Sequence, residues 1–250
     1  MARFRITVSY DGTDFVGWQR QAAGVSIQGL LEDALAELDE AAVSVLGAGR
    51  TDAGVHALGQ VAAFTLTRVI AADAVVRALN VRLPLSVRVL EAEEVAADFH
   101  PQFAATSKAY RYRIWNSDIV SPFERQYVWH VFGALDVAAM NEAARMLEGT
   151  HDFAAFQGTG SDVKTTERTV FSSLVLRQAQ DERSESVIRY EVSGAGFLRH
   201  MVRAIVGTLV EIGRGRRPPE WMREIVASRN RSEAGVTAPA AGLFLVRVEY

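Results

Sequence analysis

The residues best able to do chemistry lie in one glycine-rich stretch, LGAGRTDAGVHALGQ, at residues 46–60. A charged arginine and aspartate stand there among small residues, and both charges need partners. The stretch does not match a phosphate loop, since no Gly-Lys-Ser/Thr follows, nor a dinucleotide fingerprint, because Asp52 stands where the third glycine belongs. A structural turn explains the glycines alone. Because glycine also lets the backbone approach a ligand closely, we interpret the stretch as a site around Asp52 and Arg50.

A single carboxylate at Asp52 could act as a nucleophile or as a base. Acid-base glycosidases use two carboxylates, and only Asp11 and Asp14 could come near in space as a second one. A nearby arginine would hold Asp52 ionised. The best donor is Arg203, in GFLRHMVRAIVGTLVEIG, although an ordinary surface arginine explains it as well. The helix predicted there buries one apolar stripe, formed by Phe197, Met201, Ile205, Leu209 and Ile212.

Aromatic and basic residues alternate in the middle of the chain, a mixture that proteins use to stack bases and to neutralise phosphates. The aromatic members are Phe99, Phe103, Tyr110 and Tyr112, and the basic ones are Lys108, Arg111 and Arg113. Alternating tyrosines on a strand also build an ordinary core, so the pattern alone leaves both interpretations open.

The composition limits the class of protein. The chain has 250 residues, 49% of them hydrophobic, which is enough for a sizeable core. With no cysteine, disulfides, thiolate metal sites and a cysteine nucleophile are excluded. The start, MARFRITVSYDG, lacks the apolar core of a signal peptide, and no apolar run approaches the roughly 20 residues of a membrane span. We therefore expect a cytoplasmic protein. The histidines, at positions 56, 100, 130, 151 and 200, show no metal-ligand spacing.

The charges are segregated along the chain. The net charge of −3 argues mildly against a nucleic acid partner. Residues 27–45 and 91–98 are acidic, however, whereas residues 199–231 are rich in arginine. This distribution fits a basic cleft with an acidic back, and equally an arginine-rich solvated helix surface.

Hydrophobic periodicity predicts an α+β fold. The first hundred residues read as strand, helix, strand, strand, helix, strand, the order of a split βαβ, ferredoxin-like unit. We assign spans to five of these six elements: strands at 3–9, 60–66 and 86–95, a helix after the N-cap Ser26 to residue 38, and a helix at 71–80 that ends before Pro84.

A similar pattern begins again after residue 105. We expect two similar halves, residues 1–105 and 106–250, with mixed or antiparallel sheets flanking a central basic cleft. The polar connector at 178–185 is predicted to be a solvated hairpin tip. The other predicted elements are strands at 107–116, 169–177, 186–193 and 243–250, a helix capped by Asp136, a helix from about 198 to 212, and a short helix opening at Pro218 and Pro219.

Five segments, in their order and spacing, resemble the tRNA pseudouridine synthase A family over residues 9–250. They are YDGTDFVGWQRQ, GAGRTDAGVHALGQ, KAYRYRIWN, GFLRHMVRAIVGTL and GLFLVRVEY. The resemblance implies the pseudouridine synthase fold and conversion of uridine to pseudouridine at nucleotides 38 to 40 of the tRNA anticodon arm. It also implies a homodimer that binds tRNA across both subunits, with neither a metal nor an organic cofactor.

The same resemblance implies roles for individual residues. Asp52 would be the catalytic aspartate, Tyr110 would stack on the target base, and Arg203 would pair with the aspartate. Arg50 would help to flip or hold the target nucleotide. The further residues expected to contact substrate are Thr51, Gly54, His56, Lys108 and Arg111.

One departure stands ahead of the tyrosine strand, where the family commonly has Phe-His-Ala-Arg and this chain has Pro101 and Gln102. A basic contact to RNA is missing there or is supplied by Lys108 or Arg111. Two other classes stay open besides the synthase: a catalytically silent RNA-binding protein, against which the intact GRTDAGVHA counts, and an aspartate-dependent hydrolase of nucleosides or sugars. Within the synthase, attack on the sugar or base and removal of the ribose C2′ proton are both open to Asp52.

Overall fold

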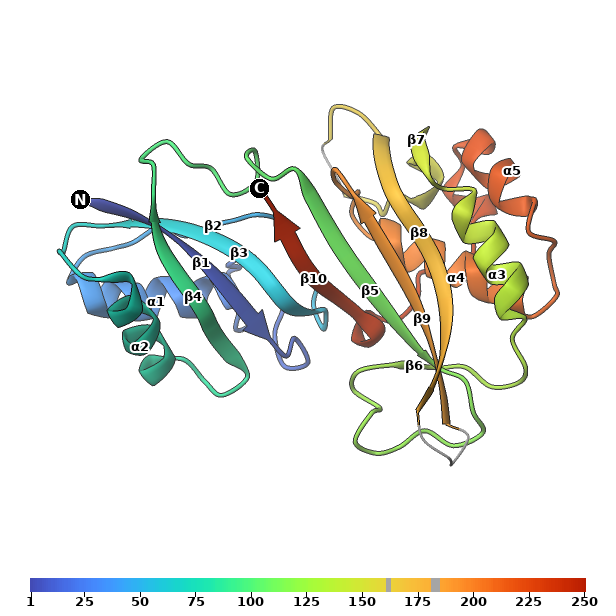
Figure 1. Ribbon diagram of the computed structural model, residues 1–250, viewed down its shortest axis with the longest axis horizontal. Helices are drawn as coiled ribbons and strands as arrows, with labels where there is room; N and C mark the ends of the chain where they lie inside the picture. Colours follow the sequence, from blue (N-terminus) through green and yellow to red (C-terminus); the bar gives the residue numbers. More distant parts are fainter. Residues whose placement is uncertain (161–162, 181–184) are drawn as a thin grey trace. The chain divides into compact units, whose positions relative to one another are not determined.

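A computed structural model describes residues 1–160, 163–180 and 185–250 (Figure 1). The chain forms two compact units. The first holds Met1–Thr106 together with Phe244–Tyr250, and the second holds Ser107–Leu243. The C-terminal strand segment, predicted to lie in the second half, therefore belongs to the first unit.

The sheet of the first unit is built around β1 (Ala2–Tyr10). β1 pairs antiparallel with β3 (His56–Leu66) on one side and with β4 (Val87–Val95) on the other. The short β2 (Leu46–Gly47) pairs antiparallel with β3. The order strand, helix, strand, strand, helix, strand is thus confirmed. β10 (Leu243–Glu249) adds a parallel partner to β3, at the end where β3 begins.

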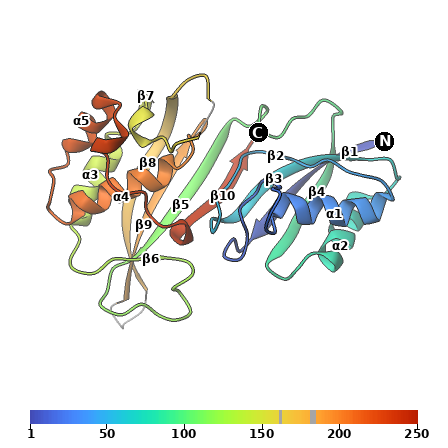
Figure 2. The ribbon, with the colours of Figure 1, turned by 180° about the vertical axis from the view of Figure 1, so that it is seen from behind.

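Two helices complete the first unit. α1 (Ile27–Asp39) lies along the sheet (Figure 2) and contacts α2 (Ala72–Arg82). Ser26 Oγ accepts a hydrogen bond from Gly29 N at 3.2 Å, so the predicted N-cap is confirmed. α2 ends before Pro84, because the residue preceding a proline favours extended backbone. The residues that α1 buries are Ile27, Gly29, Leu31, Ala34, Leu35, Leu38 and Asp39.

The sheet of the second unit is antiparallel except for one short strand. Its strands lie in the order β5 (Ser107–Trp115), β9 (Glu185–Gly194), β8 (Glu167–Gln180) and β7 (Gly149–Asp152), and β6 (Trp129–His130) pairs parallel with β5. As β3 lies between β1 and β2 in the first unit, β9 lies between β5 and β8 here. The chain is therefore α+β with two similar units. The polar connector predicted at 178–185 is shorter in the structure: residues 178–180 continue β8 and Glu185 begins β9, while residues 181–184 lie outside the described residues.

The helices of the second unit are α3 (Val137–Arg145), α4 (Met201–Gly213) and α5 (Trp221–Ser228), with short 3₁₀ turns η1 (Ala154–Phe156), η2 (Arg231–Glu233) and η3 (Ala240–Gly242). Asp136 Oδ1 accepts from Ala139 N at 3.0 Å, which confirms the predicted cap of α3. α5 begins at Trp221, after both prolines and not at them as predicted.

α4 differs from the predicted helix in two ways. It begins at Met201 rather than near residue 198, because His200 has a left-handed φ of 61° that interrupts helical geometry. It is also buried on nearly every side and not along one stripe; only Arg203 and Glu211 are partly exposed. It ends at Gly213 as predicted, where a Cβ would lie 2.6 Å from Met140 Sδ of α3, so this glycine permits close helix packing.

The C-terminal residue of α1 gives a test of stability. The carboxylate of Asp39 accepts hydrogen bonds from Thr67 N (3.0 Å) and Arg68 N (2.8 Å), and these bonds lower the pKa of Asp39. A depressed folded-state pKa contributes stability above the unfolded value of about 3.9 and loses it as pH falls through the folded value. We expect Asp39→Asn to lower the free energy of unfolding by about 1–3 kcal/mol at neutral pH.

Urea unfolding of parent and variant as a function of pH measures this difference. It should shrink as the pH falls from about 4 through the lower pKa of folded Asp39, because the parent carboxylate then becomes protonated as well. Asp73→Asn is the matched control, because Asp73 is exposed and pairs with Arg77 on the surface of α2. Equal destabilisation by both substitutions would contradict the assignment.

Candidate active site

Asp52 lies in a tight turn just before β3. Its carbonyl oxygen accepts a hydrogen bond from Val55 N at 3.1 Å, and Gly54 has a φ of +75°, which glycine adopts without strain. The side chain of Asp52 is partly exposed and that of Arg50 is exposed, whereas Thr51 and Val55 are buried. The turn therefore presents its charged residues and fixes the uncharged ones.

Two glycines of the neighbouring turn let this loop pack backbone to backbone. A Cβ on Gly12 would lie 2.0 Å from the carbonyl oxygen of Val55. A Cβ on Gly17, whose φ is +105°, would lie 2.6 Å from the carbonyl oxygen of Thr51. That same oxygen accepts a hydrogen bond from Trp18 N at 3.0 Å. Asp52 is thus carried by a tightly packed loop.

The glycines inside the loop also have structural partners. A Cβ on Gly47 would lie 2.6 Å from the indole ring of Trp18, and the carbonyl of Gly49 accepts from Gln60 Nε2 at 2.9 Å. We predict that these glycines let the backbone approach a ligand closely. At Gly47, the group that the backbone approaches is a buried tryptophan.

A buried polar network lies beneath the loop. The hydroxyl groups of Tyr10 and Thr51 share a hydrogen bond of 2.8 Å. Burial raises the pKa of Tyr10 to about 12, while hydrogen bonds with the side chains of Thr51 and Gln60 act in the opposite direction. The phenol therefore stays neutral at physiological pH. Thr51 supports the loop through this bond, and its predicted contact with substrate stays a prediction.

His56 joins three segments of the first unit. Its side chain is almost fully buried, its Nδ1 accepts from Gly12 N at 3.0 Å, and its ring stacks on Phe244 of β10 at 4.7 Å between centroids. Asp11 Oδ1 lies 3.1 Å from the same Nδ1, a contact that becomes an ion pair only when the imidazole is protonated. Asp11 Oδ1 also accepts from Thr13 N at 3.0 Å. His56 therefore lies inside the unit, beneath the loop.

In the second unit, the alternation of β5 separates the two basic residues that we expected to contact substrate. Lys108 and Tyr110 are on one face and Arg111 is on the other. Arg111 Nε donates to Glu191 Oε1 at 2.7 Å. Burial, and then the positive charge of Arg168, lowers the pKa of Lys108. Lys108 is therefore the one that shares a face with the tyrosines.

The two tyrosines of β5 have different surroundings. Tyr112 is fully buried and its hydroxyl donates to the carbonyl oxygen of Pro239 at 2.8 Å, so the core interpretation holds for it. Tyr110 is 9% exposed, and its ring meets Phe197 edge to face, with centroids 5.0 Å apart. Phe197, predicted to lie on the buried stripe of the helix, precedes α4.

The side chain and the backbone of Arg203 both bond Ala238. Its Nε donates to the carbonyl oxygen of Ala238 at 2.8 Å, and Ala238 N donates to the carbonyl oxygen of Arg203 at 3.1 Å. Asp52 belongs to the first unit, and Tyr110 and Arg203 belong to the second. The predicted pairing of Asp52 with Arg203 stays a prediction.

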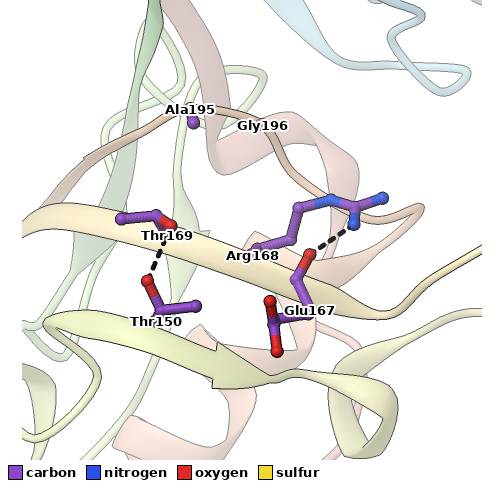
Figure 3. A pocket seen from close by; sticks show the side chains of 6 residues that line it. All are labelled: Thr150, Glu167, Arg168, Thr169, Ala195 and Gly196. Atoms are coloured by element: carbon purple, nitrogen blue, oxygen red, sulfur yellow. Dashed lines mark hydrogen bonds between the residues drawn. The ribbon is translucent and has the colours of Figure 1, made fainter.

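A pocket of about 250 Å³ lies beside the strand ends of the second unit (Figure 3). The hydroxyl groups of Thr150 and Thr169 share a hydrogen bond of 2.8 Å across it, and Arg168 Nη1 donates to the carbonyl oxygens of Thr165 (2.9 Å) and Glu167 (2.6 Å). Burial lowers the pKa of Arg168. Sequence reasoning missed this pocket, because only the pairing of β7 with β8 brings its threonines together. Its lining residues are Thr150, Glu167, Arg168, Thr169, Ala195 and Gly196.

The segment that departs from the family pattern packs against the C-terminal residue. The carbonyl oxygen of Pro101 accepts from the hydroxyl of Tyr250 at 2.9 Å, and Gln102 N donates to His100 Nδ1 at 3.2 Å. The side chain of Gln102 is exposed. Pro101 thus contributes its carbonyl to the fold.

Two histidines of the second unit lie beside backbone carbonyls. His130 Nε2 lies 2.8 Å from the carbonyl oxygen of Ser117, and His151 Nε2 lies 2.9 Å from that of Glu148. Among the described residues, no group of three or more histidines, cysteines or acidic residues is placed to hold a metal ion. The helices of the described part of the chain are too short or too polar to cross a membrane.

Comparison with known proteins identifies the family. The family model for tRNA pseudouridine synthase matches residues 6–104 and 143–250. A tRNA pseudouridine synthase A of Myxococcus xanthus is 48% identical over 250 residues, all of this chain and 92% of the relative. Enzymes of the same name from Solibacter usitatus and Syntrophotalea carbinolica are 46% and 44% identical; each match spans all of this chain, with 100% and 97% of the relative. The chain belongs to the tRNA pseudouridine synthase family.

The packing of the Asp52 loop can be tested at Gly17. We expect Gly17→Ala to displace residues 51–52, since the added methyl would overlap the Thr51 carbonyl. Amide exchange at Trp18 and Val55, measured by mass spectrometry, should become faster. Gly215→Ala is the control, because Gly215 also has a positive φ, +69°, but nothing lies within 4 Å of its Cβ position. Unchanged exchange in Gly17→Ala would show that the close approach does not hold the loop.

Proposed function

We propose that this chain converts uridine to pseudouridine in tRNA, with Asp52 as the catalytic carboxylate. The observation that carries the proposal is the loop itself. Asp52 is partly exposed, while Thr51 before it and Val55 after it are buried and hydrogen-bonded. The carboxylate is therefore accessible and still held in one place, as catalysis by positioning requires. Membership of the tRNA pseudouridine synthase family supports tRNA as the substrate and an isomerase as the class of enzyme.

The proposed reaction breaks the bond between uracil N1 and ribose C1′, turns the base and joins C5 to C1′. N1 gains a hydrogen and C5 loses one, so the composition of the nucleotide is unchanged and no water or redox partner is consumed. Asp52 either adds to the sugar or base, or removes the C2′ proton so that the reaction passes through a glycal. Each route uses the carboxylate oxygens of Asp52, which the partly exposed side chain leaves accessible.

Two residues of the second unit complete the proposed chemistry. Tyr110 stacks on the target base once it has left the helix, which offsets part of the cost of unstacking. Its ring plane is set by the edge-to-face contact with Phe197. Arg203 pairs with Asp52 and places a positive charge beside its carboxylate. Because its Nε is bonded to the carbonyl of Ala238, the guanidinium has less rotational freedom to lose when it pairs.

We propose that the RNA backbone contacts Arg50, Lys108 and the pocket at Arg168. Arg50 is exposed, two residues from Asp52, and so can hold the flipped nucleotide. Lys108 and Arg168 are partly buried; burial lowers the pKa of Lys108, and the positive charge of Arg168 lowers it further. A phosphate bound between them would relieve this repulsion, and the Thr150 and Thr169 hydroxyls offer neutral hydrogen bonds beside it.

The finer features rest on the resemblance to the A family. We propose that the enzyme modifies nucleotides 38 to 40 of the anticodon arm, that it is a homodimer binding tRNA across both subunits, and that it is cytoplasmic. The hydrolase alternative needs a second carboxylate, and Asp11 is engaged with Thr13 and His56. This arrangement favours the isomerase. A catalytically silent binding protein has no use for an accessible Asp52.

The direct test is Asp52→Asn. We expect it to abolish pseudouridine formation on an unmodified tRNA transcript while binding of the transcript stays within a few-fold, because the amide keeps the shape of the carboxylate and loses its charge. Chemical mapping of pseudouridine measures the reaction and its position together. Asp14→Asn, an exposed aspartate of the neighbouring turn, is the control and should leave the reaction intact.

Activity in the Asp52→Asn enzyme would contradict the assignment of Asp52 as the catalytic residue. Release of free uracil by the parent protein would instead favour the hydrolase. Binding without any reaction by the parent would favour the silent RNA-binding protein.

The proposed phosphate contact at Arg168 predicts a change in salt dependence. Arg168→Gln should weaken tRNA binding and reduce the slope of log affinity against log salt by about 1, because one fewer counterion is released. Filter binding between low and physiological salt measures the slope. Arg223→Gln on the exposed face of α5 is the control. An unchanged slope at Arg168 would remove this residue from the interface.

A further inference from the structure

The segment at residues 234–239, which we call the crossing segment, passes directly over α4. A Cβ on Gly207 of α4 would lie 1.7 Å from the carbonyl oxygen of Val236, and a Cβ on Gly235 would lie 2.6 Å from Thr208 N. Gly235 N donates to Thr208 Oγ1 at 2.9 Å, and Thr208 Oγ1 donates to the carbonyl of Ala204 at 3.0 Å. The segment and the helix therefore meet backbone to backbone, in one fixed register.

Arg231 also holds the crossing segment. Its Nη1 donates to the carbonyl oxygen of Gly235 at 2.9 Å, and its Nη2 donates to Thr237 Oγ1 at 2.8 Å. One planar guanidinium thus bonds both a backbone and a side-chain oxygen of the segment, and this fork geometry restricts the segment more than a single point contact would.

The end of the crossing segment connects α4 with β5. Arg203 Nε of α4 donates to the carbonyl oxygen of Ala238, and the Tyr112 hydroxyl of β5 donates to the carbonyl oxygen of Pro239, the next residue. Both bonds measure 2.8 Å. Burial raises the pKa of Tyr112, and the positive charge of Arg203 acts in the opposite direction, as expected for neighbours. Tyr112 is also two residues from Tyr110, on the same face of β5.

We propose that Tyr112 is a positioning residue for the isomerisation: through the carbonyls of Pro239 and Ala238 it sets the guanidinium of Arg203 relative to the ring of Tyr110. This inference rests on the proposed function, in which Arg203 and Tyr110 serve one reaction. The two residues come from different elements, a helix and a strand. The crossing segment is bonded to both, so the hydroxyl of Tyr112 transmits the position of the strand to the arginine of the helix.

A buried tyrosine that merely satisfies its hydroxyl would make the same bond, and the chain offers a matched comparison. Tyr190 of β9 lies directly opposite Tyr112 in the sheet register. It too is fully buried, and its hydroxyl bonds Ser173 Oγ at 3.0 Å, away from the crossing segment. Tyr112→Phe and Tyr190→Phe therefore each remove one buried hydroxyl from one sheet face, and only the first removes a link to Arg203.

The experiment compares kcat, KM, tRNA affinity and Tm for parent, Tyr112→Phe and Tyr190→Phe on an unmodified tRNA transcript. We expect Tyr112→Phe to lower kcat about tenfold with KM and affinity within about twofold, because misplacing a reacting group costs turnover more than binding. Tyr190→Phe should keep kcat within about twofold, with a fall in Tm similar to that of Tyr112→Phe. Equal kcat in the two variants would overturn the inference.

A second variant removes the contacts of Arg231 with the crossing segment. Arg231→Gln should also lower kcat without raising KM, and Arg231→Lys should recover part of the loss. Parent-like kcat in Arg231→Gln would count against transmission through the segment. Arg203→Ala separates the two proposals: if it keeps the parent kcat, the proposed role of Arg203 fails, whereas a large loss there together with an unaffected Tyr112→Phe overturns the inference alone.

Discussion

The loop that carries Asp52 can lie where it does only because Gly12 and Gly17 have no side chains. Their backbone approaches the carbonyl oxygens of Val55 and Thr51 more closely than any Cβ would permit. The other supports depend on this contact. The Trp18 N–H reaches Thr51, and the imidazole of His56 reaches Gly12 N, because the two turns touch. What resembles flexibility in the sequence is therefore a requirement for close packing.

In the second unit, glycines allow the same close backbone packing against a helix, α4. α4 is buried on almost every side, so the few polar groups that it keeps need defined partners. Thr208 finds them in Ala204 and Gly235, and Arg203 finds one in Ala238. In both units, backbone groups come into contact where a glycine has no side chain. Hydrogen bonds at that contact then hold a polar residue beside it.

Local patterns in the sequence predict the elements of this fold well. The caps Ser26 and Asp136 act as expected, and alternation finds the long strands, because each signal depends on neighbours a few residues away. The failures have longer range. No local signal tells that β10 belongs with the first unit, or that the left-handed backbone of His200 delays α4.

At the candidate site the same division holds. Asp52 stands out from its motif, and the resemblance names Tyr110 and Arg203. The supporting groups, such as Tyr10 beneath Thr51 or Phe197 beside Tyr110, come from segments 41 and 87 residues away, and only the packed structure brings them together. Alternation alone would have separated Lys108 from Arg111, since neighbouring odd and even positions of a strand face opposite ways.

The place of β10 has a consequence for biosynthesis. Residues 244–250, which are most of β10 and Tyr250, complete the first unit, where Phe244 pairs with His56 and the carbonyl of Glu249 accepts from Thr106 N. A ribosome makes this strand only after all of residues 107–243. Domains generally fold in order as they emerge, but here the first unit waits, with part of one edge of β3 unpaired, until the second has been synthesised. Its native sheet is therefore completed only when translation of the second unit is over.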